Sequence, residues 1–219
     1  MCPSEFIETI RIENGEICNI SYHQQRMDKT RRDCVSNALP LRLEHLIRSF
    51  FAMERMNTHG VENCDFVYTD LPKGRTKCRV VYSDVVKDIS FSAYSIRPVS
   101  TLRLVCCDDI DYSYKSTDRS DLKKLFEQRG DADDVLICRN GLITDTSIGN
   151  VALFDGSEWH TPASPLLCGT QRQYLIDNGV IKERDIPASE ISKYKKIAII
   201  NAMIPFGELE VSVENCGTK

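Results

Sequence analysis

Three dipeptides that end in glycine set the strongest limit on how this chain can fold. Asn14-Gly15, Asn140-Gly141 and Asp155-Gly156 each lie between segments in which apolar and polar residues alternate. Such dipeptides tolerate the backbone angles of tight two-residue turns, so each of them predicts a β-hairpin. A chain of 219 residues with hairpins near both ends must contain antiparallel sheet.

Helices are expected between these hairpins. Apolar residues at Leu43, Leu46, Ile47, Phe50 and Phe51 form a helical stripe in residues 41–56. The other expected helices cover residues 22–35, 120–130 and 169–179, the last with Thr170 as its cap and a glycine at its end. Further strands are expected in residues 65–84 (two strands around a turn at 72–74), 89–109, 195–203 and 208–215.

This mixture of hairpins and helices predicts an α+β fold rather than a doubly wound sheet. The break at Pro98 and Ser100 places a domain boundary near residues 97–103. The expected domains are therefore a smaller α/β domain over residues 1–99 and a larger C-terminal domain over residues 100–219.

The composition excludes several classes of protein. A net charge of −4 argues against a dedicated nucleic-acid binder. There is no run of about 18 apolar residues, so no transmembrane helix is expected. The N-terminus lacks the basic start and apolar core of a signal peptide, so we expect a cytoplasmic protein.

Neither the cysteines nor the histidines predict a metal site. The ten cysteines include no C-x-x-C pair, and Cys106-Cys107 are adjacent, which suits neither zinc nor a disulfide. The four histidines are scattered without the spacing of metal ligands. Most of the cysteines are expected to be small buried hydrophobes in a reducing compartment.

No nucleotide-binding motif and no nucleophile elbow is present. Several segments instead resemble the class IV aminotransferase family, the fold type IV pyridoxal-phosphate enzymes. They are YKSTDR (114–119), ITDTSIGNVALF (143–154), TPASPLLCGTQR (161–172) and INAM (200–203), preceded by FIETIRIENGEI (6–17) and YHQQRM (22–27). The resemblance spans nearly the whole chain and implies a mixed, barrel-like C-terminal domain that binds pyridoxal 5'-phosphate.

The resemblance implies a role for each matching residue. Lys115 would hold the cofactor and later transfer protons, although taken alone it would be one more solvated lysine. Asp145 would face the ring nitrogen, where most of the family has glutamate. Thr146 and Ser147 would line the same cavity.

The cofactor phosphate needs a cation and amide donors. Arg26 matches the family's phosphate-binding arginine. Gly169-Thr170 and Asn201-Ala202 would supply backbone donors. Arg79 would bind a substrate carboxylate.

The chemistry leaves three readings open. The first is a lyase resembling aminodeoxychorismate lyase, which makes 4-aminobenzoate and pyruvate on the folate route; the K-x-x-x-R spacing of KSTDR favours it. The second is a branched-chain or D-amino-acid aminotransferase, and the third is a non-catalytic relative.

The family implies a homodimer. Its F-E-T strand here begins at residue 6, so part of the substrate wall is expected to be shorter or to come from a partner subunit.

Overall fold

The computed structural model describes residues 4–36, 38–59 and 71–217, with side chains in the 43–59 helix as far as Met53. The chain divides into two compact units, Met1–Ser95 and Ile96–Lys219. The first strand expected within residues 65–84 lies mostly outside the described residues. No helix in the described part is long and apolar enough to cross a membrane.

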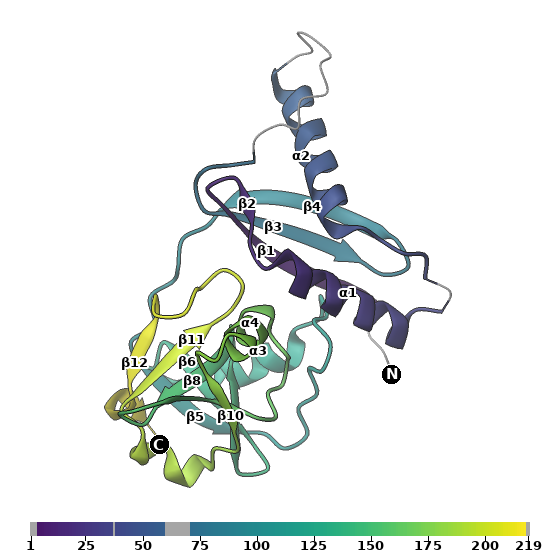
Figure 1. Ribbon diagram of the computed structural model, residues 1–219. Coiled ribbons are helices and arrows are strands. Elements are labelled where there is room, and N and C mark those ends of the chain that lie inside the picture. Colours follow the sequence, from purple (N-terminus) through teal and green to yellow (C-terminus); the bar gives the residue numbers. More distant parts are fainter. Residues whose placement is uncertain (1–3, 37, 60–70, 218–219) are drawn as a thin grey trace. The chain divides into compact units, whose positions relative to one another are not determined.

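The first unit is an antiparallel sheet with two helices (Figure 1). Its strand order is β2-β1-β3-β4, with bounds Phe6–Glu13 (β1), Glu16–Ile17 (β2), Thr76–Tyr82 (β3) and Val86–Ala93 (β4). The helices are α1 (Ile20–Cys34) and α2 (Leu43–His59). Alternate residues of β1 are buried, and buried His23 of α1 contacts buried Glu8 on that face. The period-2 burial is why this segment forms a strand with one covered face.

The second unit is built on a branched sheet. Among the described residues its strands run in the order β10-β9-β8-β7-β6-β5-β13, and β11 pairs with both β8 and β12. The bounds are Leu102–Cys106 (β5), Asp134–Arg139 (β6), Leu142–Thr146 (β7), Asn150–Phe154 (β8), Trp159–Pro162 (β9), Lys182–Arg184 (β10), Lys196–Ile200 (β11), Glu210–Ser212 (β12) and Cys216–Gly217 (β13). Its helices are α3 (Ser120–Glu127) and α4 (Thr170–Asp177), with short 3-10 helices at Ala188–Lys193 and Val213–Asn215.

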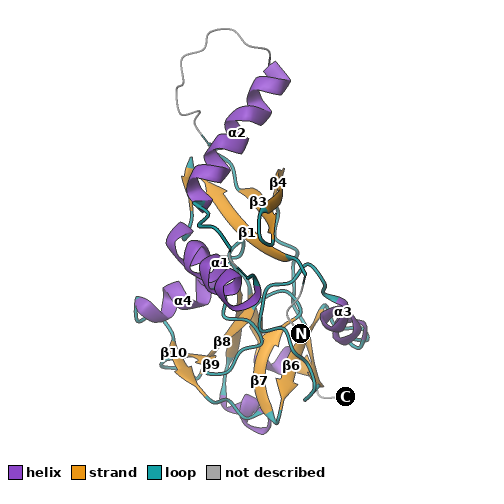
Figure 2. Ribbon diagram, turned by 90° about the vertical axis from the view of Figure 1, so that its right-hand side faces the viewer, coloured by secondary structure: helices purple, strands orange, loops and turns teal. Residues whose placement is uncertain are grey.

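Both faces of this sheet are covered. Val135 and Ile137 of β6 pack with Leu122 and Leu125 of α3, whereas Leu136 between them points into the main core cluster. Leu175 of α4 packs in the same way on the neighbouring strands β8 and β11. Figure 2 shows α3 beside β6 and β7, and α4 beside β8 and β9. A strand covered on both faces is apolar along its length and does not alternate. The VLIC run of β6 and the VAL run of β8 have this continuous apolar character.

The expected secondary structure is largely confirmed. The three hairpins form as the pairs β1–β2, β6–β7 and β8–β9. Asn14, Gly15, Asn140 and Gly141 all have the positive φ angles that the turns require. The four expected helices are α1 to α4.

Two expectations are wrong. Gly169, in extended conformation, is the N-cap of α4, and Thr170 is its first helical residue. Among the eight described cysteines only Cys78 and Cys138 are buried, while Cys106 and Cys168 are exposed. Composition indicates how many thiols a chain has but not which side of a strand or loop each one occupies.

Candidate active site

Asp145 is a buried carboxylate near the end of β7. Its side chain accepts three hydrogen bonds: Asn150 Nδ2 donates to Oδ1 at 2.7 Å, and the backbone amides of Leu166 and Leu167 donate to Oδ2 at 2.8 and 3.1 Å. Burial raises the pKa of Asp145 to about 6, although these donors act in the opposite direction. The carboxylate is thus ionised at neutral pH in a place that favours a cationic partner.

Asn150 connects Asp145 to the segment before α4. Its Nδ2 also donates to the Leu167 carbonyl at 2.8 Å, so one amide ties two segments together. Gly169 lies so close that a Cβ built on it would be 2.0 Å from Asn150 Oδ1. Only glycine fits here without displacing the amide that orients Asp145.

The first turn of α4 is held firmly in place. Arg172 is almost fully buried, and its Nη2 donates to the Pro162 carbonyl at 2.8 Å and to Glu183 Oε1 at 2.6 Å. Thr170, the first helical residue, is 4% exposed. A helix N-terminus presents backbone N–H groups and a positive dipole end, which together suit a phosphate.

Two turns next to Asp145, over residues 146–149 and 201–204, are hydrogen-bonded to each other. Thr146 accepts at Oγ1 from the amide of Gly149, and its own amide donates to the Gly149 carbonyl at 2.8 Å. Asn201 Nδ2 donates to the Ile148 carbonyl at 2.9 Å. A Cβ on Gly149 would lie 2.5 Å from the Ile200 carbonyl oxygen, so the two turns approach too closely for any larger residue. Half-buried Ala202 follows in the second turn.

Lys115 lies half-buried in the segment that leads to α3. The next residue, Ser116, is buried; its carbonyl accepts from the Tyr112 hydroxyl at 3.1 Å, and its Oγ accepts from the Asp118 amide at 3.0 Å. Arg119 Nη2 donates to the Ser147 carbonyl at 2.5 Å. The lysine segment is therefore fastened to the loop that follows Asp145.

Arg26 and Arg79 belong to the first unit. Arg26 forms a bidentate pair with Glu8, with Nε to Oε1 at 2.9 Å and Nη2 to Oε2 at 2.6 Å. Burial raises the pKa of Glu8, but Arg26 and His23 outweigh burial and lower it to about 2. Arg79 on β3 is 39% exposed and lies 3.5 Å from Asp88. The roles of these two arginines toward cofactor and substrate stay predictions.

A buried carboxylate of the second unit was not foreseen from the sequence. Asp134 at the start of β6 is fully buried, accepts at Oδ1 from the Ser147 amide at 3.3 Å, and pairs at Oδ2 with Arg97 Nη2 at 2.6 Å. The only signal for it is the acidic pair Asp133-Asp134 directly before an apolar run. Among the residues that the structure describes, no group of His, Cys, Asp and Glu is arranged to hold a metal ion.

Comparison with known proteins identifies the family of this chain. The amino-transferase class IV family model matches residues 5–208. An uncharacterized protein of Haemophilus influenzae is 37% identical over 196 residues, covering 90% of this chain and 96% of that protein.

Solved structures with a similar fold include a candidate 4-amino-4-deoxychorismate lyase from Haemophilus somnus. It is 34% identical, with a TM-score of 0.80, and the match covers 94% of this chain and 99% of that one. A hypothetical aminotransferase from Mycobacterium tuberculosis in its pyridoxal-phosphate-bound form is 16% identical, with a TM-score of 0.72 and coverage of 97% and 81%. The chain belongs to the amino-transferase class IV family and has the fold of its pyridoxal-phosphate enzymes.

Proposed function

We propose that this chain is a pyridoxal-phosphate-dependent lyase that converts 4-amino-4-deoxychorismate to 4-aminobenzoate and pyruvate. The observation that carries the proposal is the buried Asp145 carboxylate, held by three donors directly beside the start of α4. This pairing of an acid and a helix N-terminus matches the two ends of the cofactor, a basic ring nitrogen and a phosphate.

We assign each part of the cofactor to residues of this chain. Lys115 would hold its aldehyde carbon, and Asp145 would keep its ring nitrogen protonated. Thr146 and Ser147 would line the ring's cavity. Gly169, Thr170, Asn201 and Ala202 would offer donors to the phosphate. Arg26 is proposed as the cation of the phosphate from the family resemblance alone; in the first unit its guanidinium pairs with Glu8. The bound cofactor supplies an electron sink for the carbon that bears the substrate amine.

The chain's own part in the reaction is proton transfer and positioning. The Lys115 amine takes the proton from the ring carbon that bears the amino group. The neighbouring carbon–oxygen bond then breaks, the six-membered ring becomes aromatic, and the departing enol gains a proton on its methylene carbon to become pyruvate. Asp145 would face the ring nitrogen as a carboxylate whose two oxygens are oriented by three donors.

Two features support a lyase over an aminotransferase. The relative from Haemophilus somnus is a candidate lyase of this type at 34% identity. The K-x-x-x-R spacing is present, and its arginine bonds to the loop after Asp145. A branched-chain or D-amino-acid aminotransferase is the second candidate, since the same lysine and aspartate would serve it. As in the family, the working form is proposed to be a homodimer.

The test is an assay of the purified protein loaded with pyridoxal phosphate. The lyase releases equal amounts of pyruvate and 4-aminobenzoate from 4-amino-4-deoxychorismate with no 2-oxo acid present. Lys115→Ala abolishes both products, while Lys124→Ala, at an exposed position that pairs with Asp121, keeps them. Amino-group transfer from a branched-chain or D-amino acid to 2-oxoglutarate, without pyruvate release, would establish the second candidate instead.

A further inference from the structure

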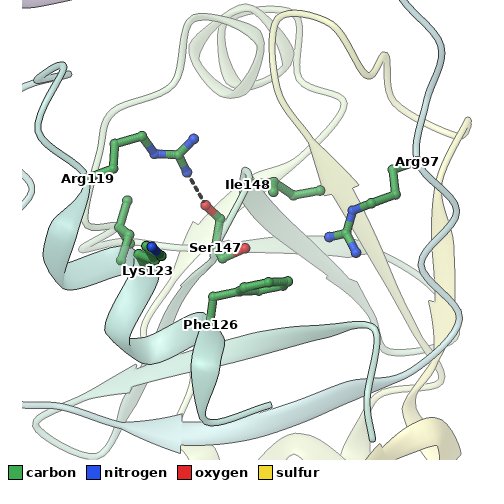
Figure 3. A pocket seen from close by; sticks show the side chains of 7 residues that line it. Arg97, Arg119, Lys123, Phe126, Ser147 and Ile148 are labelled. Carbon is green, nitrogen blue, oxygen red and sulfur yellow. Dashed lines mark hydrogen bonds between the residues drawn. The ribbon is translucent and has the colours of Figure 1, made fainter. Parts of the chain in front are cut away.

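An open cavity of about 360 Å³ lies in the second unit between α3, the loop after Asp145 and the segment at Arg97 (Figure 3). Arg97, Arg119 and Lys123 line it, and no carboxylate does. The rest of its lining is Ser147 and three apolar side chains, Leu122, Phe126 and Ile148. A cavity with cations at its rim and an apolar floor suits an organic anion.

The three cations differ in how far their charge is already neutralised. Arg97 pairs with buried Asp134 at 2.6 Å. Arg119 donates to the Ser147 carbonyl, a neutral acceptor, and has no carboxylate partner among the described residues. Lys123 likewise forms no ion pair with any residue in the described part of the chain. Two positive charges in this cavity thus lack a counter-charge from the described residues.

Ser147, which we place beside the cofactor ring, also lines this cavity. Ser147 is two residues after Asp145, and Arg119 is four residues after Lys115. Figure 3 shows Arg119 and Arg97 reaching from opposite sides toward Ser147 and Ile148, with Phe126 below them. An anion held here is therefore next to the loop that contains Asp145, which favours a part of the substrate over an unrelated ligand.

We propose that Arg119 and Lys123 bind a carboxylate of the substrate in this cavity, with its carbon skeleton on Phe126 and Ile148. This inference rests on the proposed function and deepens it. It assigns the enzyme a substrate that carries a carboxylate remote from its reacting amine. The parallel N–H groups of a guanidinium fix the orientation of a bound carboxylate, and a neighbouring ammonium group adds a second positive charge that attracts it.

Chorismate tests the cavity apart from the chemistry, because it has the carboxylates of the proposed substrate but a hydroxyl in place of the amine. Calorimetric titration of the holoenzyme should give a dissociation constant that Arg119→Gln and Lys123→Gln each raise by about tenfold to hundredfold. Arg119→Lys should recover part of the loss, and Lys124→Gln, on the same helix, should match the wild type. In turnover, the same variants should raise KM by a larger factor than they lower kcat.

The outcomes are distinguishable. A wild-type holoenzyme that binds chorismate but releases no pyruvate from 4-amino-4-deoxychorismate would remove the proposed lyase reaction and leave the cavity assignment standing. Equal chorismate affinity in wild type, Arg119→Gln and Lys123→Gln would overturn the cavity assignment. The assignment would also be overturned if inorganic phosphate bound as tightly as chorismate in competition, because the site would then recognise small anions in general. The cofactor's absorbance should be unchanged in Lys123→Gln, because the Lys123 side chain makes no bond to the Ser147 loop among the described residues. A loss of chorismate affinity in that variant then cannot come from collapse of the loop.

Discussion

The side-chain amide of Asn150 donates one hydrogen bond to Asp145 Oδ1 at 2.7 Å and another to the Leu167 carbonyl at 2.8 Å. Asp145 and Asn150 are also direct partners in the β7–β8 pair. The acid that we assign to the cofactor ring is thus oriented by the residue opposite it and by the segment that leads into α4. This arrangement makes Asn150 a positioning residue for Asp145.

Changing this amide to an acid should disable the site. Asn150→Asp replaces the donor with a second carboxylate, so Asp145 is forced toward its protonated form. We expect pyridoxal-phosphate affinity to fall by at least about tenfold, the effect of one lost charge-assisted hydrogen bond. Absorbance titration of the cofactor measures this. An Asn150→Asp protein that binds the cofactor as the wild type does would contradict the role given to Asn150.

Asp145 should impose a pH dependence on the stability of the cofactor-free protein. The pKa of this carboxyl group is about 6 in the folded protein and 3.8 in the unfolded chain. As pH rises, the group therefore loses its proton in the unfolded chain before it does so in the folded protein. The contribution of this group to the free energy of unfolding is complete below pH 3.8 and is lost as pH rises through 6. The loss amounts to about 3 kcal/mol.

Urea unfolding of cofactor-free protein between pH 4 and 7 tests this effect. Asp145→Asn has no group to titrate there, so the difference between wild type and variant should shift by about 3 kcal/mol across the window. Parallel pH curves for the two proteins would show that Asp145 is not perturbed as described. The same variant, loaded with cofactor, should lose at least about a hundredfold in kcat.

Gly169 should not tolerate a methyl group. In Gly169→Ala the new Cβ would meet Asn150 Oδ1 at 2.0 Å, so Asn150 or the start of α4 must move. We expect a destabilisation of about 1–3 kcal/mol together with weaker cofactor binding. Gly74→Ala is the matched control, because nothing lies within 4 Å of its Cβ and its φ is not positive. Similar melting temperatures for the two variants would refute the close approach.

The first unit depends on a buried carboxylate of its own. Glu8 pairs with Arg26 and His23, and its folded pKa of about 2 lies below the ordinary 4.5. Its contribution is therefore present above pH 4.5 and is lost as pH falls toward 2. Glu8→Gln should lower the free energy of unfolding at pH 7 by about 3–5 kcal/mol. Glu16→Gln, at an exposed position, should change it by less than about 0.5 kcal/mol, and equal effects would rule out the buried pair.

Local signals in the sequence predict most of the fold. The Asn-Gly turns and the stripe in α2 act over a few residues, so the hairpins and helices follow from them directly. Strands without an apolar signal were not predicted. For example, β10 is entirely exposed and polar, and it becomes a strand only by pairing in parallel with β9.

The candidate site was predictable only in part, for a similar reason. Motif order predicts Asp145 and the glycine before α4, and the structure connects them through Asn150. Asp134 and Arg97 lie 37 residues apart and meet only in the folded unit, where a buried carboxylate requires a cation. No periodicity in the chain marks such a pair.

The account depends most directly on the amine of Lys115. Wild-type protein with pyridoxal phosphate should show an absorbance band near about 410–430 nm that borohydride removes, because the cofactor is attached to that amine. Lys115→Ala should show no such band, while Lys124→Ala should keep it. A Lys115→Ala protein that retains the band and its sensitivity to borohydride would contradict the assignment.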